Sequence, residues 1–159
     1  MTSVTVLQAL QSMEFTQNLE PKHLEKLASI ATHVTFSEGA TIFREGDASE
    51  LVYLIEEGQV SLVTQVPGHG QVTILTLGPG QLLGWSSLFP PQRKSAGAQA
   101  MEPTRVIAIN ATQLRNLCQT DHSLGNSIMW RVAEIISTRL RAARAQLLDI
   151  FEPTKKKEK

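Results

Sequence analysis

Between residues 35 and 77 the chain is built from short runs rich in β-branched and aromatic residues. Each run is bounded by glycine, proline or acidic residues that are typical of turns. Turn signals spaced about 8–12 residues apart predict an antiparallel sandwich or barrel as the body of the fold. The runs cover residues 35–36, 40–43, 51–55, 60–64 and 72–77, and residues 105–109 form one more.

Helical patterns flank this β-rich body on both sides. Residues 4–14 and 21–32 carry apolar side chains at helical spacing, and Pro21 suits a first helical position because no N–H is needed there. Asn110 is expected to cap a short helix through about residue 119, and Gln113, three residues further on, completes a pair like that of a capping box. The prediction is a mainly β fold with flanking helices: N-terminal helices over residues 1–32, a β-roll over 33–110, C-terminal helices over 111–151 and a basic tail over 152–159.

The longest predicted element is a helix over about residues 123–151, which contain no proline. Its first apolar stripe, Leu124, Ile128, Val132 and Ile135, is expected to lie on the sheet. A second stripe alternates steps of four and three residues, which is typical of a coiled-coil seam. This predicted seam consists of Met129, Ala133, Ile136, Leu140, Ala143, Leu147 and Ile150.

The predicted seam has two interpretations: a helix packed along its own domain, or a contact with a second copy. At 1.5 Å per residue the helix would be about 43 Å long, more than a domain of 159 residues can cover on both faces. Leaving Leu140, Leu147 and Ile150 in water would forfeit on the order of 1.5–3 kcal/mol each. The pattern therefore favours a parallel homodimer. Gly125, near the helix start, allows either a close approach or a bend.

A candidate anion-binding turn lies within residues 84–96. An apolar run ends at Gly84, and small residues there could expose several backbone N–H groups, beside which the cations Arg93 and Lys94 return. Exposed N–H donors beside positive charge suit an anion such as a phosphate. The plainer interpretation is a β-turn followed by a strand, with ordinary surface cations.

Charge is balanced over the whole chain but not along it. The net charge is zero, yet residues 131–159 hold eight cations and four acids, a net of +4. A basic end suits an acidic partner or nucleic acid, although the Lys-Lys-Lys-Glu-Lys tail is more simply a solvated end. No apolar run approaches the roughly 18 residues of a membrane span, and the N-terminus lacks signal-peptide features, so a cytoplasmic protein is expected.

Catalytic and metal-binding patterns are not found in the sequence. Cys118 is the one cysteine, which excludes an internal disulfide and a cysteine-built metal site. The four histidines show no ligand spacing, and Ser86 and Ser87 lack a nucleophile-elbow motif or a nearby histidine. The expectation is a protein that is not an enzyme, with no certain cofactor and no metal.

With these elements assembled, the chain resembles the cyclic-nucleotide-binding domain of the catabolite-activator type over roughly residues 15–150. The specific parts are Ile-Phe-Arg-Glu-Gly-Asp at 42–47, Tyr-Leu-Ile-Glu-Glu-Gly at 53–58 followed by Val60, Leu-Gly-Pro-Gly at 77–80, Gly84, and Ser95-Ala96. The resemblance implies a double-stranded β-helix (jelly-roll-like) with a long dimerisation helix. It also implies a phosphate-binding cassette at Gly84, Trp85, Ser86, Ser87, Leu88, Arg93, Lys94, Ser95 and Ala96.

The chain departs from the family pattern at two cassette positions. The family has a glutamate after the glycine, which accepts the ribose hydroxyl; here the residue is Trp85, which accepts no hydrogen bond. The family has an arginine before the Ser-Ala pair; here it is Lys94, which cannot make two parallel hydrogen bonds. Trp85 could stack on a ligand ring or fill the pocket.

The resemblance therefore predicts a ligand-sensing regulatory module with altered or weakened cyclic nucleotide binding. Its ligand is a cyclic nucleotide or another small anion, and its output goes to a partner protein. The family's usual helix-turn-helix domain is not expected, because only residues 152–159 follow the long helix. The alternative is a structural or protein-interaction dimer without a ligand.

Overall fold

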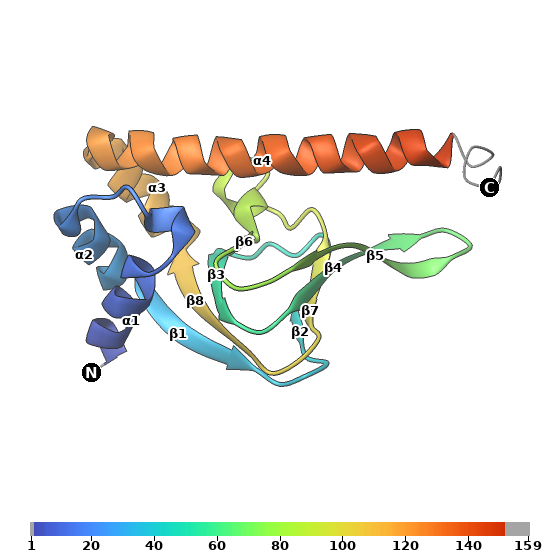
Figure 1. The fold of residues 1–159 in the computed structure, drawn as a ribbon, viewed down its shortest axis with the longest axis horizontal. Coiled ribbons are helices and arrows are strands. Elements are labelled where there is room, and N and C mark those ends of the chain that lie inside the picture. Colours follow the sequence, from blue (N-terminus) through green and yellow to red (C-terminus); the bar gives the residue numbers. More distant parts are fainter. Residues whose placement is uncertain (1, 152–159) are drawn as a thin grey trace, which may run out of the picture.

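The computed structural model describes residues 2–151 as two packed β-sheets with helices at one end and a long helix across the top (Figure 1). Each sheet has four strands, and every neighbouring pair is antiparallel. The first sheet has the order β1 (Ala31–Phe36), β8 (Thr104–Asn110), β3 (Leu51–Glu57), β6 (Leu82–Leu83). The second has the order β2 (Thr41–Phe43), β7 (Gly97–Ala100), β4 (Val60–Val66), β5 (Gly70–Leu77). The predicted jelly-roll-like fold is confirmed.

The helices lie where the sequence places them, but the first two end earlier than predicted. They are α1 (Thr2–Gln11), the 3-10 turn η1 (Glu14–Thr16), α2 (Pro21–Ser29), η2 (Trp85–Leu88), α3 (Ala111–Thr120) and α4 (His122–Ile150). The helix predicted over 4–14 ends at Gln11. The helix predicted over 21–32 ends at Ser29, because Thr32 pairs with Ala108 of β8 and Val34 with Val106. Pairing with a distant strand overrides the local helical spacing there.

The central strands of the first sheet, β8 and β3, are buried on both faces. Along β3, Val52 and Leu54 face the helices while Tyr53 and Ile55 face the second sheet. The alternation follows from the two-residue period of a strand. The helix-side core is completed by residues of α1, α2, α3 and the first half of α4, so α4 is anchored at that end.

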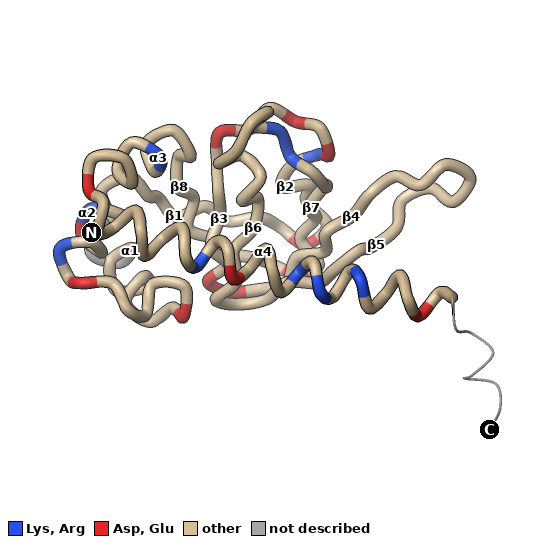
Figure 2. The backbone as a smooth tube through the Cα atoms, turned by 90° about the horizontal axis from the view of Figure 1, so that it is seen from above, with Lys and Arg blue, Asp and Glu red and all other residues tan. Residues whose placement is uncertain are grey.

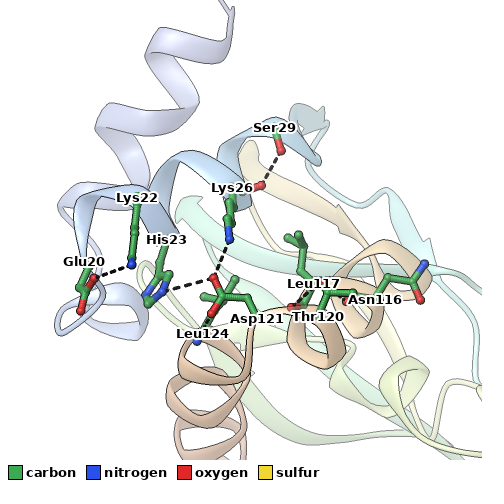
Figure 3. Close-up of polar contacts among 10 residues, drawn as sticks. All are labelled: Glu20, Lys22, His23, Lys26, Ser29, Asn116, Leu117, Thr120, Asp121 and Leu124. Carbon is green, nitrogen blue, oxygen red and sulfur yellow. Dashed lines mark hydrogen bonds and ion pairs between the residues drawn. The ribbon is translucent and has the colours of Figure 1, made fainter.

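Asp121 joins the start of α4 to α2 (Figure 3). Its Oδ1 accepts from the Leu124 backbone N–H at 3.1 Å, which caps α4, and its Oδ2 lies 2.6 Å from Lys26 Nζ. The buried His23 Nε2 lies 3.5 Å from the same carboxylate. Gly125 serves a close approach, because a Cβ there would collide with the Cys118 carbonyl oxygen. The junction between α3 and α4 is therefore tight.

The second half of α4 runs past the helix-side core. Beneath it the β4–β5 hairpin projects from the roll (Figure 1). Figure 2 shows cations following one another along this half, with an acid near its end. In the single chain Leu140, Leu147 and Ile150 are 69%, 55% and 69% exposed. None of the helices within residues 2–151 combines the length and apolar character that a bilayer span requires.

Candidate functional site

The turn after β6 is built around a left-handed glycine. Gly84 has φ of 79° and precedes the 3-10 turn η2. That backbone region is costly for residues with a Cβ, and a Cβ here would also lie 2.7 Å from Lys94 Nζ. A glycine is required because the turn doubles back directly over a buried ammonium group.

Lys94 lies under this turn rather than in solvent. The side chain is 2% exposed, and its Nζ donates to the Leu51 carbonyl at 2.5 Å, the Gly84 carbonyl at 3.0 Å and Ser87 Oγ at 2.7 Å. The ammonium also lies 4.7 Å from the Phe43 ring centroid. An ammonium has three protons, so these three acceptors satisfy its hydrogen-bonding capacity.

Burial has an electrostatic consequence for Lys94. Desolvation lowers the pKa of its ammonium to about 8, while the charge of Asp47 opposes that shift. The backbone on both sides is also held, since Lys94 N–H donates to the Asp47 carbonyl at 2.9 Å and Lys94 accepts from Gly46 N–H at 2.8 Å. Lys94 therefore ties the turn to β3 and to the loop after β2.

Arg93 points to the opposite side of this loop. Its guanidinium donates to the Gly46 carbonyl at 3.0 Å, and the residue is exposed. Several N–H groups within residues 84–96 also have partners in the same segment: Ser87 N–H donates to the Gly84 carbonyl and Ser95 N–H to Ser86 Oγ, both at 3.3 Å. Some of the backbone N–H groups that were expected to face an anion therefore already donate hydrogen bonds within the segment.

A cavity of about 380 Å³ opens between the turn, the β4–β5 hairpin and α4. Trp85 forms one wall, with its ring edge against Phe89, and does not fill the space. The lining is mostly apolar and, among the described residues, contains no Asp or Glu: Phe43, Leu62, Ile74, Leu75, Gly84, Trp85, Ser86, Ser95, Ala96, Ile136, Arg139, Leu140, Ala142, Ala143 and Gln146.

Five of the nine predicted cassette residues line this cavity: Gly84, Trp85, Ser86, Ser95 and Ala96. The other four do not line it, because Ser87, Leu88 and Lys94 are buried behind the turn and Arg93 turns away. The turn and the returning segment are brought together as the sequence predicts. The ligand contacts assigned to these nine residues stay a prediction.

Arg139 is the cation that does line the cavity. Its guanidinium donates a short hydrogen bond to the Leu82 carbonyl oxygen of β6. Burial lowers the pKa of this guanidinium to about 10, so it remains charged at neutral pH. Within residues 2–151 no carboxylate forms an ion pair with it.

Reasoning from the sequence missed Arg139, although a signal was present. The core-facing stripe of the long helix, Leu124, Ile128, Val132 and Ile135, continues after one further step of four at residue 139. A cation at an apolar position on the face that packs against the sheet marks a side chain directed inward. As one of the eight cations of residues 131–159, Arg139 contributes to the basic end of the chain, and that role alone does not predict an inward side chain.

The described residues provide no metal centre. No group of three or more His, Cys, Asp or Glu side chains within residues 2–151 is arranged to hold an ion. Glu56 instead links His33, at 2.6 Å, with Arg105 on the outer edge of the roll. What the site can do with its present residues is enclose a small molecule beside a guanidinium.

The sequence profile of the cyclic nucleotide-binding domain matches residues 33–121, more than half of the chain. No curated protein matches the sequence. Among solved structures, a protein of Geobacter metallireducens assigned to the cyclic nucleotide-binding proteins is 30% identical, with a TM-score of 0.75. The match covers 84% of this chain and 96% of that one.

Two further structures show the same fold. The Thermus thermophilus catabolite activator protein is 28% identical with a TM-score of 0.71, over 84% of this chain and 61% of that protein. A cyclic nucleotide-binding domain from Methylobacillus flagellatus is 22% identical with a TM-score of 0.78, over 92% of this chain and 82% of that one.

Proposed function

Because the chain belongs to the cyclic nucleotide-binding domain family, we propose that it is a regulatory module that senses a small ligand under α4. The observation that carries this proposal is the cavity of about 380 Å³ between the Gly84 turn, the β4–β5 hairpin and α4. A volume of this order lies within the range of small-molecule sites. A bound ligand would contact both the roll and the long helix.

The ordinary cyclic nucleotides are poorly matched to this cavity. Trp85 stands where the family has the ribose acceptor, and none of the described lining residues is an acid that could accept a ribose hydroxyl. Lys94, at the family's phosphate position, already has three acceptors. A buried hydroxyl left without a partner costs about 1–3 kcal/mol, so cyclic AMP is expected to bind weakly or not at all.

The proposed output is a change in the position of α4 within a homodimer. Leu140, Leu147 and Ile150 of the predicted seam are more than half exposed in the single chain. Three seam residues, Ile136, Leu140 and Ala143, also line the cavity. A ligand that prefers one arrangement of α4 would therefore bias the dimer contact and, through it, a partner protein.

A second candidate is a scaffold that has no ligand. The geometry of Lys94 favours it, since the ammonium holds the turn closed without an external anion. In that case the dimer and its surface would be the whole function. A thermal-shift series with cyclic nucleotides, inorganic phosphate and small carboxylates separates the two candidates. A ligand at a hundredfold its dissociation constant adds about 2.7 kcal/mol to stability, whereas a scaffold shows no shift with any probe.

Calorimetry with cyclic AMP tests the altered specificity. The unmodified protein should give no heat at micromolar concentration, and the double variant Trp85→Glu with Lys94→Arg should bind measurably, about tenfold tighter or more. The two single variants are the matched controls, each restoring one half of the site. Low-micromolar or nanomolar binding by the unmodified protein would contradict the proposal. A double variant that stays silent would show that the cavity rejects the nucleotide for another reason.

A further inference from the structure

Arg139 gives the cavity a positive group whose charge is not balanced by any described residue. We infer that the cavity binds a small amphipathic carboxylate, with its carboxylate on Arg139 and its apolar body between the β4–β5 hairpin and Trp85. The inference rests on the proposed ligand-sensing function and names its ligand class. It places the anion on α4, away from the turn where Lys94 lies.

The hydrogen bonding of Arg139 leaves room for an anion. A guanidinium has five N–H donors, and the Leu82 carbonyl is the one acceptor found for it within residues 2–151. A partly buried cation that lacks a counter-charge is unfavourable, and a carboxylate can pair with the planar fork through two parallel hydrogen bonds. The unused donors therefore select a planar anion.

A neighbouring cavity, which shares Arg139, Leu75 and Ala142 with the first, is a poorer place for that anion. It measures about 300 Å³ and is also bordered by Arg139, but its lining adds Arg131 and two acids, Glu14 and Glu134, of which Glu134 is paired with Arg131 at 3.5 Å. The two acids offset the two cations of that lining, so a carboxylate would gain less there than beside a guanidinium that no acid opposes. The cavity beside Trp85 has Arg139 and no acid among its described lining residues, so its lining carries a net positive charge, whereas the charges of the other cavity balance.

The remaining lining selects an apolar body. Leu62 and Leu75 contribute from the hairpin, Ile136 and Leu140 from α4, and Trp85 closes the end at the turn. Burying a hydrocarbon chain against these side chains is favourable in proportion to the area removed from water. The polar groups of a sugar or a base would meet few partners here. A medium-chain or aromatic carboxylate fits this combination of one anion-binding group and an apolar wall.

The test uses the fluorescence of Trp85. The chain has two tryptophans, and Trp130 is 65% exposed on α4, so Trp130→Phe leaves Trp85 as the single reporter. Titration with sodium octanoate should change the Trp85 emission in a saturable way. In the same background 1-octanol, which has the same chain length and no charge, should bind about tenfold more weakly or worse.

Variants of Arg139 test whether its guanidinium binds the carboxylate of the ligand. Arg139→Met should weaken octanoate about tenfold or more, and Arg139→Lys should fall between, because it keeps the charge but loses the fork. Arg141→Met is the matched control: Arg141 lies two positions further along α4, exposed, with its guanidinium on Ser137. The Arg141→Met variant should bind octanoate with unchanged affinity. The thermal midpoint of each variant, measured without ligand, confirms that it is folded.

Three results would overturn the inference: equal affinity for octanol and octanoate, unchanged octanoate affinity in folded Arg139→Met, or no saturable octanoate binding. The last result is compared with the thermal-shift series. If a cyclic nucleotide or phosphate still stabilises the protein, the ligand class named here is wrong and the sensing function stands. If no probe stabilises it, both fall and the scaffold remains.

Discussion

The two halves of α4 have similar apolar content and opposite environments. In the first half Leu124, Ile128 and Val132 are at most 1% exposed, packed on β3, β8 and the helices. In the second half Leu140, Leu147 and Ile150 are more than half exposed, beside a cavity and a projecting hairpin. One continuous helix therefore joins an anchored segment to one that its own chain leaves uncovered.

If α4 responds to a ligand as proposed, this difference separates the stabilising part of the helix from the responding part. Helices gain most of their stability from packing of an apolar face, so the first half secures α4 to the domain. The second half has few buried contacts, which is the property expected of a segment that moves when a ligand binds. The cavity lies where the buried and the exposed halves of α4 meet, at Ile136 and Arg139.

The largest expected effect is on the anchored half. Ile128→Ala should lower the free energy of unfolding by about 2–5 kcal/mol, because it deletes a fully buried side chain and leaves a cavity. Leu148→Ala, at a side chain 54% exposed and outside the seam, should change it by less than about 0.5 kcal/mol. Urea unfolding of both variants measures the contrast. Similar losses would mean that the second half is also packed in solution.

The next effect concerns association through the uncovered half. Leu147 and Leu148 are equally exposed, at 55% and 54%, but only Leu147 belongs to the predicted seam. Leu147→Glu should therefore weaken dimerisation about tenfold or more by placing charge in an apolar contact, whereas Leu148→Glu should leave it intact. Sedimentation equilibrium over a concentration series gives the measurement. A protein that is monomeric at all concentrations, or a dimer indifferent to Leu147→Glu, contradicts the seam.

The smallest effect is a pH dependence at the anchor. The hydrogen bond from Lys26, then the one from Leu124 N–H, lowers the pKa of the Asp121 carboxyl from 3.8 to about 2. A lowered folded-state pKa means that the ionised form contributes stability above about pH 4. That contribution is lost as the pH falls through about 2.

Asp121→Asn, which cannot ionise, is the matched variant for this prediction. Thermal midpoints between pH 5 and pH 2 should fall more steeply for the unmodified protein than for Asp121→Asn. Parallel slopes would mean that the ion pair with Lys26 does not hold in solution. The effect is modest because the pair lies near the surface, where water screens it.

Much of the framework could be predicted because it depends on local chemistry. Asn110 caps α3 through the Gln113 N–H at 2.9 Å, as its side chain and position predict. The glycine at position 84 adopts the left-handed turn, and α4 ends at Ile150, before Pro153. The predicted ends of α1 and α2 were wrong, and at the end of α2 pairing with β8 overrode the local pattern.

The candidate site was predicted less completely, because its geometry depends on contacts between distant parts of the chain. Lys94 and Arg93 are adjacent in sequence, yet one is enclosed by Leu51, Gly84 and Ser87 while the other reaches Gly46. Sequence spacing does not distinguish these outcomes. Nor does it show that Arg139 lines the same cavity as Trp85, which is 54 positions away.

The sequence by itself determined the order of strands and helices, the turn at Gly84 and the apolar stripes of α4, since period and turn chemistry act over a few residues. Tertiary structure alone decided which cation faces the cavity and which is enclosed. The reason is that the environment of a charge is set by the groups that surround it in space, and these come from β3, the turn and α4 together.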